Sequence, residues 1–499
     1  MMTTRISLIV ASLLPLAASA AVETAVISEQ VLARGGARLS AQGRGFFSSA
    51  RDPQDPESKP TGVLLHETLV GGEAGDLGAG VRFSNRLTTN GPRDLNTPFT
   101  LEKKTLRGEL GDLRVELGDS YQELGRGIAL ALYRDPVLGL DTTLEGASVR
   151  YRPEGWEAGA FGGRVNPWKV PVAVQPVDSP LLGREAFLAG GQAQARLAAD
   201  AVVGTHYLMT WSRKTGATVM EKRWQTVGAW AAVDGVGGAV DLYAEANLLT
   251  PENLARPDLS QARGWGAFAS AAWSGGGWRA RIEGKDYGRF AYDLRRPPNI
   301  EDDVVLTLNT TDVASARLFA ERLFPEAKAS AGGSMLAGYD RVLGVPFYHG
   351  LATAKHHALG AEWEWKGGYR WAVARNDLVH VGGKAKIPTA KAQALELEAK
   401  AILQVKNLQA TPQREDRYTL GVTYSFSERW AAGLGYEGLP TNPADAGRGF
   451  TNANLAYRSG SFAAKGFVGQ TGGGAQCSGG VCRQVPPYKG AMVEGTYAF

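Results

Sequence analysis

The feature that most constrains this chain is a repeated alternation of charged and apolar side chains over segments of about ten residues. In residues 278–285 the charged side chains are Arg279, Arg281, Glu283 and Lys285, and each residue between them is apolar or glycine. Successive side chains of a β-strand point to opposite faces of the sheet. Each such segment therefore predicts a strand with one charged and one apolar face, and the chain is predicted to be all-β.

The two faces differ in a way that favours lipid over a packed core. Other charged positions that alternate with apolar neighbours are Arg107, Glu109, Arg114, Glu116, Arg150, Glu396 and Glu398. The apolar faces are rich in alanine and glycine, with Trp and Tyr near the segment ends, whereas a soluble core requires larger aliphatic side chains packed to native density. Lipid requires no such fit and favours aromatic side chains at its two interfaces. We predict a transmembrane antiparallel β-barrel of roughly 18–20 strands, with an exported soluble β-sandwich as the alternative.

The ends of the chain suggest how it is exported. Arg5, an apolar run and the small residues Ala18-Ser19-Ala20 predict a signal peptide over residues 1–20. We expect residues 21–60 to lead into the barrel and residues 61–499 to form it. A formal net charge of +4 with no polybasic block argues against a nucleic-acid partner.

The last ten residues resemble the closing strand of bacterial outer-membrane barrels. Val493, Gly495, Tyr497 and Phe499 share one parity, and the chain ends on an aromatic residue. In that class of proteins the motif is read by the barrel-insertion machinery, so the resemblance implies Sec export, insertion into the bacterial outer membrane and contact with its lipid. An edge strand of a soluble sandwich would show the same alternation.

Two regions break the pattern. Residues 167–184 are rich in proline and predict a long loop. Residues 290–349 are predicted to be a longer loop insertion, in which Thr311-Asp312 and the apolar spacing of residues 313–325 suggest a short amphipathic helix with an N-cap. That helix could constrict the barrel or cover its mouth. Residues 365–369 read as a short turn.

The reactive residue types do not form a recognisable catalytic motif. Cys477 and Cys482 are close enough in sequence to form a disulfide at the tip of a loop. His356 and His357 would point to opposite sides of a strand, which makes them a poor ligand pair. The sequence contains no HExxH, GxSxG or phosphate-binding loop. We therefore predict no enzyme activity, no metal and no cofactor, with an outer-membrane hydrolase as a minor alternative.

One block of sequence resembles a known family. Its members are Gly118, Asp119, Tyr121, Glu123, Gly125 and Gly127, followed by an apolar run over residues 128–133 and by Leu138-Gly139-Leu140-Asp141. The block is similar to one in a family of uncharacterised, porin-like outer-membrane proteins, and the resemblance, mainly over residues 60–165 and the closing strands, implies a barrel but no activity. We further expect a bend at Gly125 and Gly127 and packing of residues 128–133 against the barrel wall.

The charges define two functional hypotheses. Their mixed signs predict cross-strand pairs that line or fill a wet lumen, or that merely neutralise each other. The first hypothesis is a porin-like barrel that passes small solutes or ions across the outer membrane. The alternative is a non-conducting barrel that anchors or scaffolds an envelope assembly for secretion, motility or polymer export. Oligomeric state is not predicted.

Overall fold

The structure is a computed structural model, and nearly all of the residues that it describes lie in β-strands or short turns. It describes residues 37–50, 61–89, 97–135, 140–169, 184–214, 220–253, 263–290, 298, 300, 312–342, 344–372, 376–406, 413–441, 448–472, 474–478, 481–485 and 488–498. The predicted signal peptide lies outside these ranges. No α-helix occurs among the described residues, and so none of them forms a helix able to span a membrane.

Twenty-five strands belong to one antiparallel sheet. In chain order the long strands are β1 Ala37–Ala50, β2 Thr61–Ala74, β3 Leu77–Thr89, β4 Thr97–Leu110, β5 Leu113–Ser120, β9 Leu140–Tyr151, β10 Trp156–Lys169, β11 Arg184–Ala198, β12 Ala201–Lys214, β13 Met220–Val236, β14 Val240–Asn253, β15 Gly264–Gly275, β16 Trp278–Gly288, β17 Val313–Phe324, β18 Ala329–Asp340, β19 Val345–Ala358, β20 Ala361–Ala372, β21 Asn376–Ala390, β22 Gln393–Lys406, β23 Gln413–Ser425, β24 Trp430–Gly438, β25 Gly449–Ser459, β26 Phe462–Thr471 and β29 Tyr488–Ala498. The short strands are β6 Glu123–Leu124, β7 Leu130–Ala131, β8 Arg134–Asp135, β27 Gly474–Ser478 and β28 Val481–Val485.

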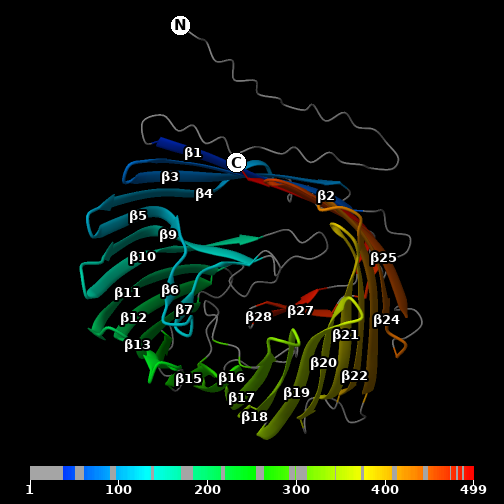
Figure 1. Ribbon diagram of the computed structural model, residues 1–499. Coiled ribbons are helices and arrows are strands. Elements are labelled where there is room, and N and C mark those ends of the chain that lie inside the picture. Colours follow the sequence, from blue (N-terminus) through cyan, green and yellow to red (C-terminus); the bar gives the residue numbers. More distant parts are fainter. Residues whose placement is uncertain are drawn as a thin grey trace.

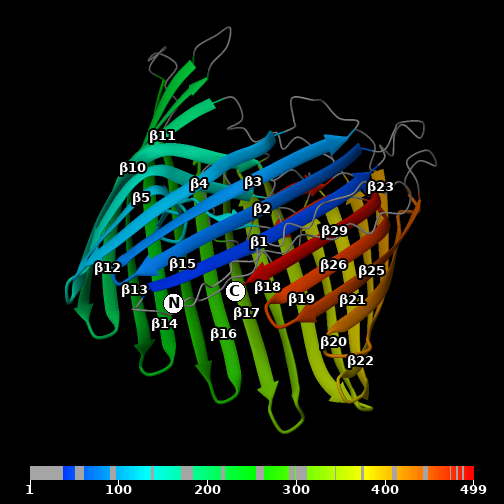
Figure 2. The ribbon, with the colours of Figure 1, turned by 90° about the horizontal axis from the view of Figure 1, so that it is seen from above.

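The sheet returns to its first strand. β1 pairs along its length with β2 and also with β29, and β29 pairs on its other side with β26. Figure 1 looks into the resulting ring, and Figure 2 shows its strands from the side. β8 pairs only with β9, so the described ring has 24 strands. The all-β antiparallel architecture is confirmed, whereas the predicted strand number was too low.

Three strands, β1, β17 and β18, lie where the sequence predicts no strand of the barrel. β17 and β18 fall inside the predicted 290–349 insertion, and the predicted helix is β17. The reason is visible in β17, where the inward residues Val313, Ser315 and Arg317 are buried while Leu318 on the other face is half exposed. Because both faces carry apolar residues, the spacing could be mistaken for a helical one. Likewise, residues 365–369 are interior to β20, and β1 lies in the segment that was expected only to lead into the barrel.

The outer face of the ring is apolar and exposed. Leu248, Met335 and Leu434 have exposed fractions of 65%, 74% and 67%. A monomeric soluble protein rarely exposes a contiguous surface of this kind. Within the described strands the alternation therefore sorts apolar side chains outward and most charges inward, as the sequence predicts.

The two ends of the barrel differ. At one end the connections are tight, as between β2 and β3, where Gly75 has a φ of 58°, and between β19 and β20, where Gly360 has a φ of 73°. The connections at the opposite end are longer, and the segment between β5 and β9 enters the ring from that end (Figure 2). This asymmetry matches the short periplasmic turns and long extracellular loops of outer-membrane barrels.

Candidate functional site

The segment between β5 and β9 runs inside the ring, and we call residues 121–135 the lumen segment. It forms a small hairpin in which β6 pairs with β7, and it rejoins the wall through β8 (Figure 1). It contains much of the sequence block that resembles the uncharacterised family. The expected bend is present, because Gly125 and Gly127 have φ values of 58° and 76°.

Gly118 and Asp119 mark the point where β5 separates from β4 while it stays paired with β9. Gly118 has a φ of 94°, and a Cβ there would lie 2.0 Å from the carbonyl oxygen of Lys104, so only glycine fits. The β4–β5 pairing ends at Gly118, so Lys104 has no register partner in β5. The Asp119 carboxylate accepts a hydrogen bond from the Lys104 amide at 2.9 Å and another from the Thr143 hydroxyl at 2.7 Å. The Asp119 carboxylate thus takes the place of the strand hydrogen bond that β4 lacks where β5 separates from it.

Apolar packing holds the lumen segment against the wall. Leu124, Leu130 and Leu132 join inward residues of β9 to β12, such as Leu188, in one buried cluster. Ile128 belongs to a second cluster, whose other members are Leu249, Phe268, Tyr287, Phe290, Ile300, Val313 and Leu336. Each large aliphatic side chain buried in this way contributes roughly 1.5–3 kcal/mol. The expected packing of residues 128–133 against the barrel wall is therefore observed.

The tip of the lumen segment is fixed by a buried carboxylate of β14. The Arg126 amide donates to Glu245 at 2.8 Å, and Glu245 also accepts from Tyr243 at 2.6 Å and from Asn247 at 2.9 Å. The Arg126 guanidinium lies over the Tyr243 ring, 3.9 Å from its centroid. A Cβ on Gly125 would lie 2.3 Å from the Glu245 carboxylate. Glycine is therefore required for this close approach.

A second buried carboxylate closes the wall beside β5. Asp141 forms ion pairs with Lys103 and, at 2.6 Å, with Arg82, and it accepts a hydrogen bond from the Tyr121 hydroxyl at 2.9 Å. Burial beside this carboxylate raises the pKa of Tyr121, so its hydroxyl remains a donor at neutral pH. Removing one partner of such a buried group leaves a charge uncompensated, at a cost of about 3–5 kcal/mol. The network is consequently a structural clamp at the base of the lumen segment.

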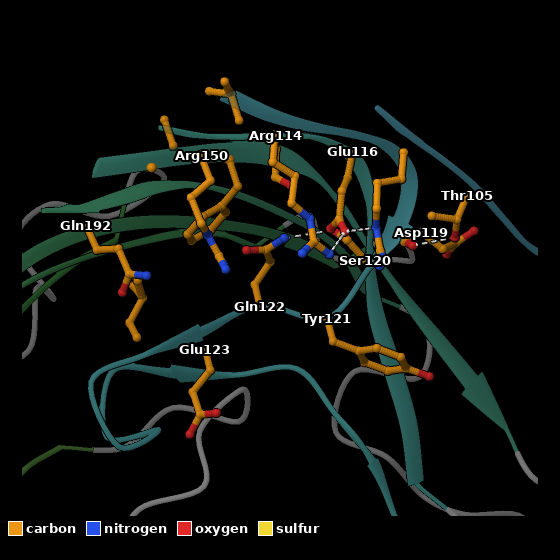
Figure 3. Close-up of a pocket in the computed structure, with 17 residues that line it drawn as sticks. Thr105, Arg114, Glu116, Asp119, Ser120, Tyr121, Gln122, Glu123, Arg150 and Gln192 are labelled. Atoms are coloured by element: carbon orange, nitrogen blue, oxygen red, sulfur yellow. Dashed lines mark hydrogen bonds and ion pairs between the residues drawn. The ribbon is translucent and has the colours of Figure 1, made fainter. Parts of the chain in front are cut away.

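A cavity of about 340 Å³ lies between the lumen segment and the β4–β11 wall (Figure 3). Arg107 and Arg114 both bind Glu116, at 2.9 and 2.6 Å. In Figure 3 the Arg114 and Glu116 side chains project from the wall toward the lumen segment. Arg150 lines the same cavity and pairs with Glu157 at 3.2 Å. The cavity is polar, but these ion pairs largely neutralise its charges.

The wall across the ring, from β19 to β22, carries charged inner faces. Lys355 pairs with Glu364 at 3.3 Å, and Lys384 with Glu396 at 2.7 Å. Glu398 and Lys400 of the same face are exposed. The lumen segment therefore covers one side of the interior, and the charges on the other side face an accessible space.

The structure brings some of the predicted residues together and separates others. Four predicted charges, Arg107, Arg114, Glu116 and Arg150, line the Figure 3 cavity, and Glu109 lies near Arg114 at 3.7 Å. On β16 and β17, Glu283 binds Arg317, and Arg279 lies near Glu321 at 3.7 Å. Arg281 lies 3.8 Å from Glu283, whereas Lys285 is buried in the next row. Glu396 and Glu398 lie on the opposite wall.

The residues that receive the lumen segment could not be found from the sequence pattern. Glu245 is one charge among many in the alternating strands, and it is 119 positions from Arg126. Arg82 and Lys103 carry no distinguishing motif, although their partner Asp141 ends the family block. No local pattern could have connected these positions, because each contact depends on which strands the closed sheet places near the lumen segment.

The two cysteines lie opposite each other in a short hairpin, and the predicted closing strand is β29. Cys477 and Cys482 are register partners in the β27–β28 hairpin, between β26 and β29, and the hairpin projects within the ring in Figure 1. Opposed residues of an antiparallel pair have the Cα separation that a disulfide needs, so the disulfide stays a prediction. Val493, Gly495 and Tyr497 lie in β29, and Phe499 lies outside the described residues. Within the described ranges, no three His, Cys, Asp or Glu side chains are grouped so as to hold a metal ion.

The described strands form one antiparallel sheet that returns to its first strand, with a charged and partly covered interior. The predicted resemblance to an uncharacterised, porin-like family is confirmed in the closing strands, since residues 389–499 match a family of unknown function (DUF6029). The match to residues 389–499 does not extend to the lumen segment. No curated protein sequence matches the chain.

Solved structures with a similar course of the chain are barrels of several kinds. They include the translocation pore of the P pilus usher PapC, with 11% identity, a TM-score of 0.44 and coverage of 92% of this chain and 99% of that one. The siderophore receptor PirA from Pseudomonas aeruginosa has 8% identity, a TM-score of 0.49 and coverage of 94% and 81%. OccK9 (OpdG) from Pseudomonas aeruginosa has 13% identity, a TM-score of 0.40 and coverage of 74% and 97%. At these values the likenesses assign neither a solute nor a partner.

Proposed function

We propose that this protein is an outer-membrane barrel whose lumen, narrowed on one side by the lumen segment, passes small solutes or ions. The observation that carries the proposal is the sorting of side chains in a closed sheet. The outer face exposes Leu248, Met335 and Leu434, and the inner face of β22 exposes Glu398 and Lys400. Lipid outside and water inside satisfy both faces at once.

Charged and paired side chains on the inner wall favour a water-filled, conducting lumen and argue against an interior filled by an apolar core. An apolar core would place residues such as Leu and Phe on β20 to β22, yet their inward positions carry Glu364, Lys384, Glu396 and Lys400. Burying such charges without water is costly. The proposed path runs beside the lumen segment, along these strands.

The proposal is tested by single-channel recording of the full-length protein, refolded in detergent and inserted into planar bilayers. We expect discrete conductance steps, and a variant that replaces residues 123–131 by a short glycine linker should raise the conductance at least twofold, because the lumen segment blocks part of the cross-section. A heat-modifiability gel checks that both proteins are folded. A folded barrel that never conducts would favour the scaffold alternative, and protein recovered dissolved in the periplasm without detergent would remove the membrane assignment itself.

A further inference from the structure

The charges on the inner face of β19 to β22 are sorted by height. Toward the tight-turn end, one register row reads Lys355, Glu364, Lys384 and Glu398, and the next reads His357, Glu362, Lys386 and Glu396. Positive and negative side chains thus face each other across neighbouring strands. The two rows together hold three lysines, four glutamates and one histidine, so their charges nearly cancel, and the pairs Lys355–Glu364 and Lys384–Glu396 are formed.

The three rows above them contain only basic and neutral residues on these four strands. The first row holds Lys366 and Lys400, the second His380, and the third His349 and Arg370. No Asp or Glu occupies an inward position in this part of β19 to β22. We call these five residues the basic patch. Carboxylates return on the flanking strands, at Glu415 of β23 and at Glu437 of β24, and Glu437 is bound to Arg417 at 3.2 Å.

The side chains at the centre of the basic patch are buried and closely packed. His349 and His380 come from strands that are not neighbours, and their Nε2 atoms lie 3.2 Å apart. They meet across Gly368 of the intervening β20, where a Cβ would lie 2.5 Å from the His380 Nε2. His349, His380 and Arg370 are each at least nine-tenths buried. Gly368 thus allows two imidazole rings, joined by one hydrogen bond, and a guanidinium to gather in the rows next to the two lysines.

We propose that the basic patch binds oxyanions and gives the lumen a preference for anionic solutes that carry a carboxylate or phosphate group; this deepens the proposed function and rests on it. A guanidinium presents a two-donor fork that matches such groups, and the ammonium groups of the two lysines add further donors. A pore region lined by one sign of charge raises the local concentration of the opposite ion. The mixed rows below the patch add no such preference.

The main test uses two double variants that each remove two positive charges. Lys366→Gln/Lys400→Gln alters the basic patch, and Lys384→Gln/Lys386→Gln alters the mixed rows. In bilayers with a KCl gradient, we expect the wild-type protein to prefer chloride, and the patch variant to lose about threefold in the chloride-to-potassium permeability ratio. The control variant should change the ratio by less than about 1.5-fold. Equal changes in the two variants, or a wild-type pore that prefers potassium, would overturn the proposal.

A binding measurement separates this inference from the question of conduction. Inorganic phosphate, and acetate in a parallel titration, are added to the detergent-solubilised full-length protein in a calorimeter. The patch variant should bind the preferred anion at least about tenfold more weakly than the control variant, and the anion that is bound identifies the group. If the barrel does not conduct but the two variants still differ in anion binding, the channel function is refuted and the oxyanion site stands. If both variants give identical titrations, the site is refuted.

Discussion

The wall from β9 to β18 and the wall from β19 to β26 belong to one sheet but treat their inner faces differently. On the first wall the inward positions include Leu188, Leu208, Leu249 and Phe268, and all four are buried under the lumen segment or beside it. On the second wall the inward positions nearer the tight turns are charged and exposed, as at Lys400 and Glu398, whereas Leu351 and Leu378 farther along are buried. The inner face is therefore apolar where the lumen segment packs on it, and it is charged at exposed positions such as Glu398 and Lys400.

This difference also explains which strands show a clear alternation of charged and apolar residues in the sequence. A strand with lipid outside and water inside alternates clearly, as in β22. A strand with lipid outside and protein inside is apolar on both faces, as β17 partly is, and its period is then ambiguous. The short polar interruptions of the covered wall, Glu245 and the Glu283–Arg317 pair, are buried and hydrogen-bonded.

The largest difference is expected when one isoleucine is truncated inside the barrel and one on its outer face. Ile128 of the lumen segment is fully buried against β15, whereas Ile282 of β16 is 59% exposed on the outer face. Ile128→Ala should lower the free energy of unfolding by about 2–5 kcal/mol because it leaves a cavity. Ile282→Ala should lower it by about 1 kcal/mol or less. Urea unfolding of refolded protein in lipid vesicles measures both, and equal effects would show that the lumen segment does not pack as described.

A charge placed on the outer face tests the membrane half of the comparison. Leu434→Arg should destabilise the barrel by about 2–4 kcal/mol in vesicles, because Leu434 is an exposed outer-face residue and lipid disfavours the guanidinium. Glu398→Gln, on the exposed inner face, should change the free energy by less than about 0.5 kcal/mol. The same vesicle unfolding assay serves for both. A tolerated arginine would mean that the outer face does not meet lipid at that height.

The smallest contrast concerns two glycines that share a positive φ. Gly155, in the turn between β9 and β10, has a φ of 85° with open space around it, whereas Gly125 has a φ of 58° and a Cβ added to it would lie 2.3 Å from the Glu245 carboxylate. Gly155→Ala should cost about 1–2 kcal/mol through the backbone alone. Gly125→Ala should cost about 1–3 kcal/mol more, since the Glu245 contact must also shift. Unfolding in vesicles measures both costs, and if they are the same, the tip of the lumen segment is not fixed by Glu245.

The sequence by itself determined the class of fold, because each strand carries its own evidence for it. That evidence is an alternation with period two and an apolar face of small residues with aromatic side chains near its ends. The sequence also indicated the bend at Gly125 and Gly127 and the packing of residues 128–133, since glycine and an apolar run have local meanings. Only the tertiary structure decided the strand number, the course of residues 313–324 as a strand, and the partners Glu245 and Asp141. These depend on ring closure, which places strands more than a hundred residues apart beside one segment, and no local pattern encodes which wall that segment will cover.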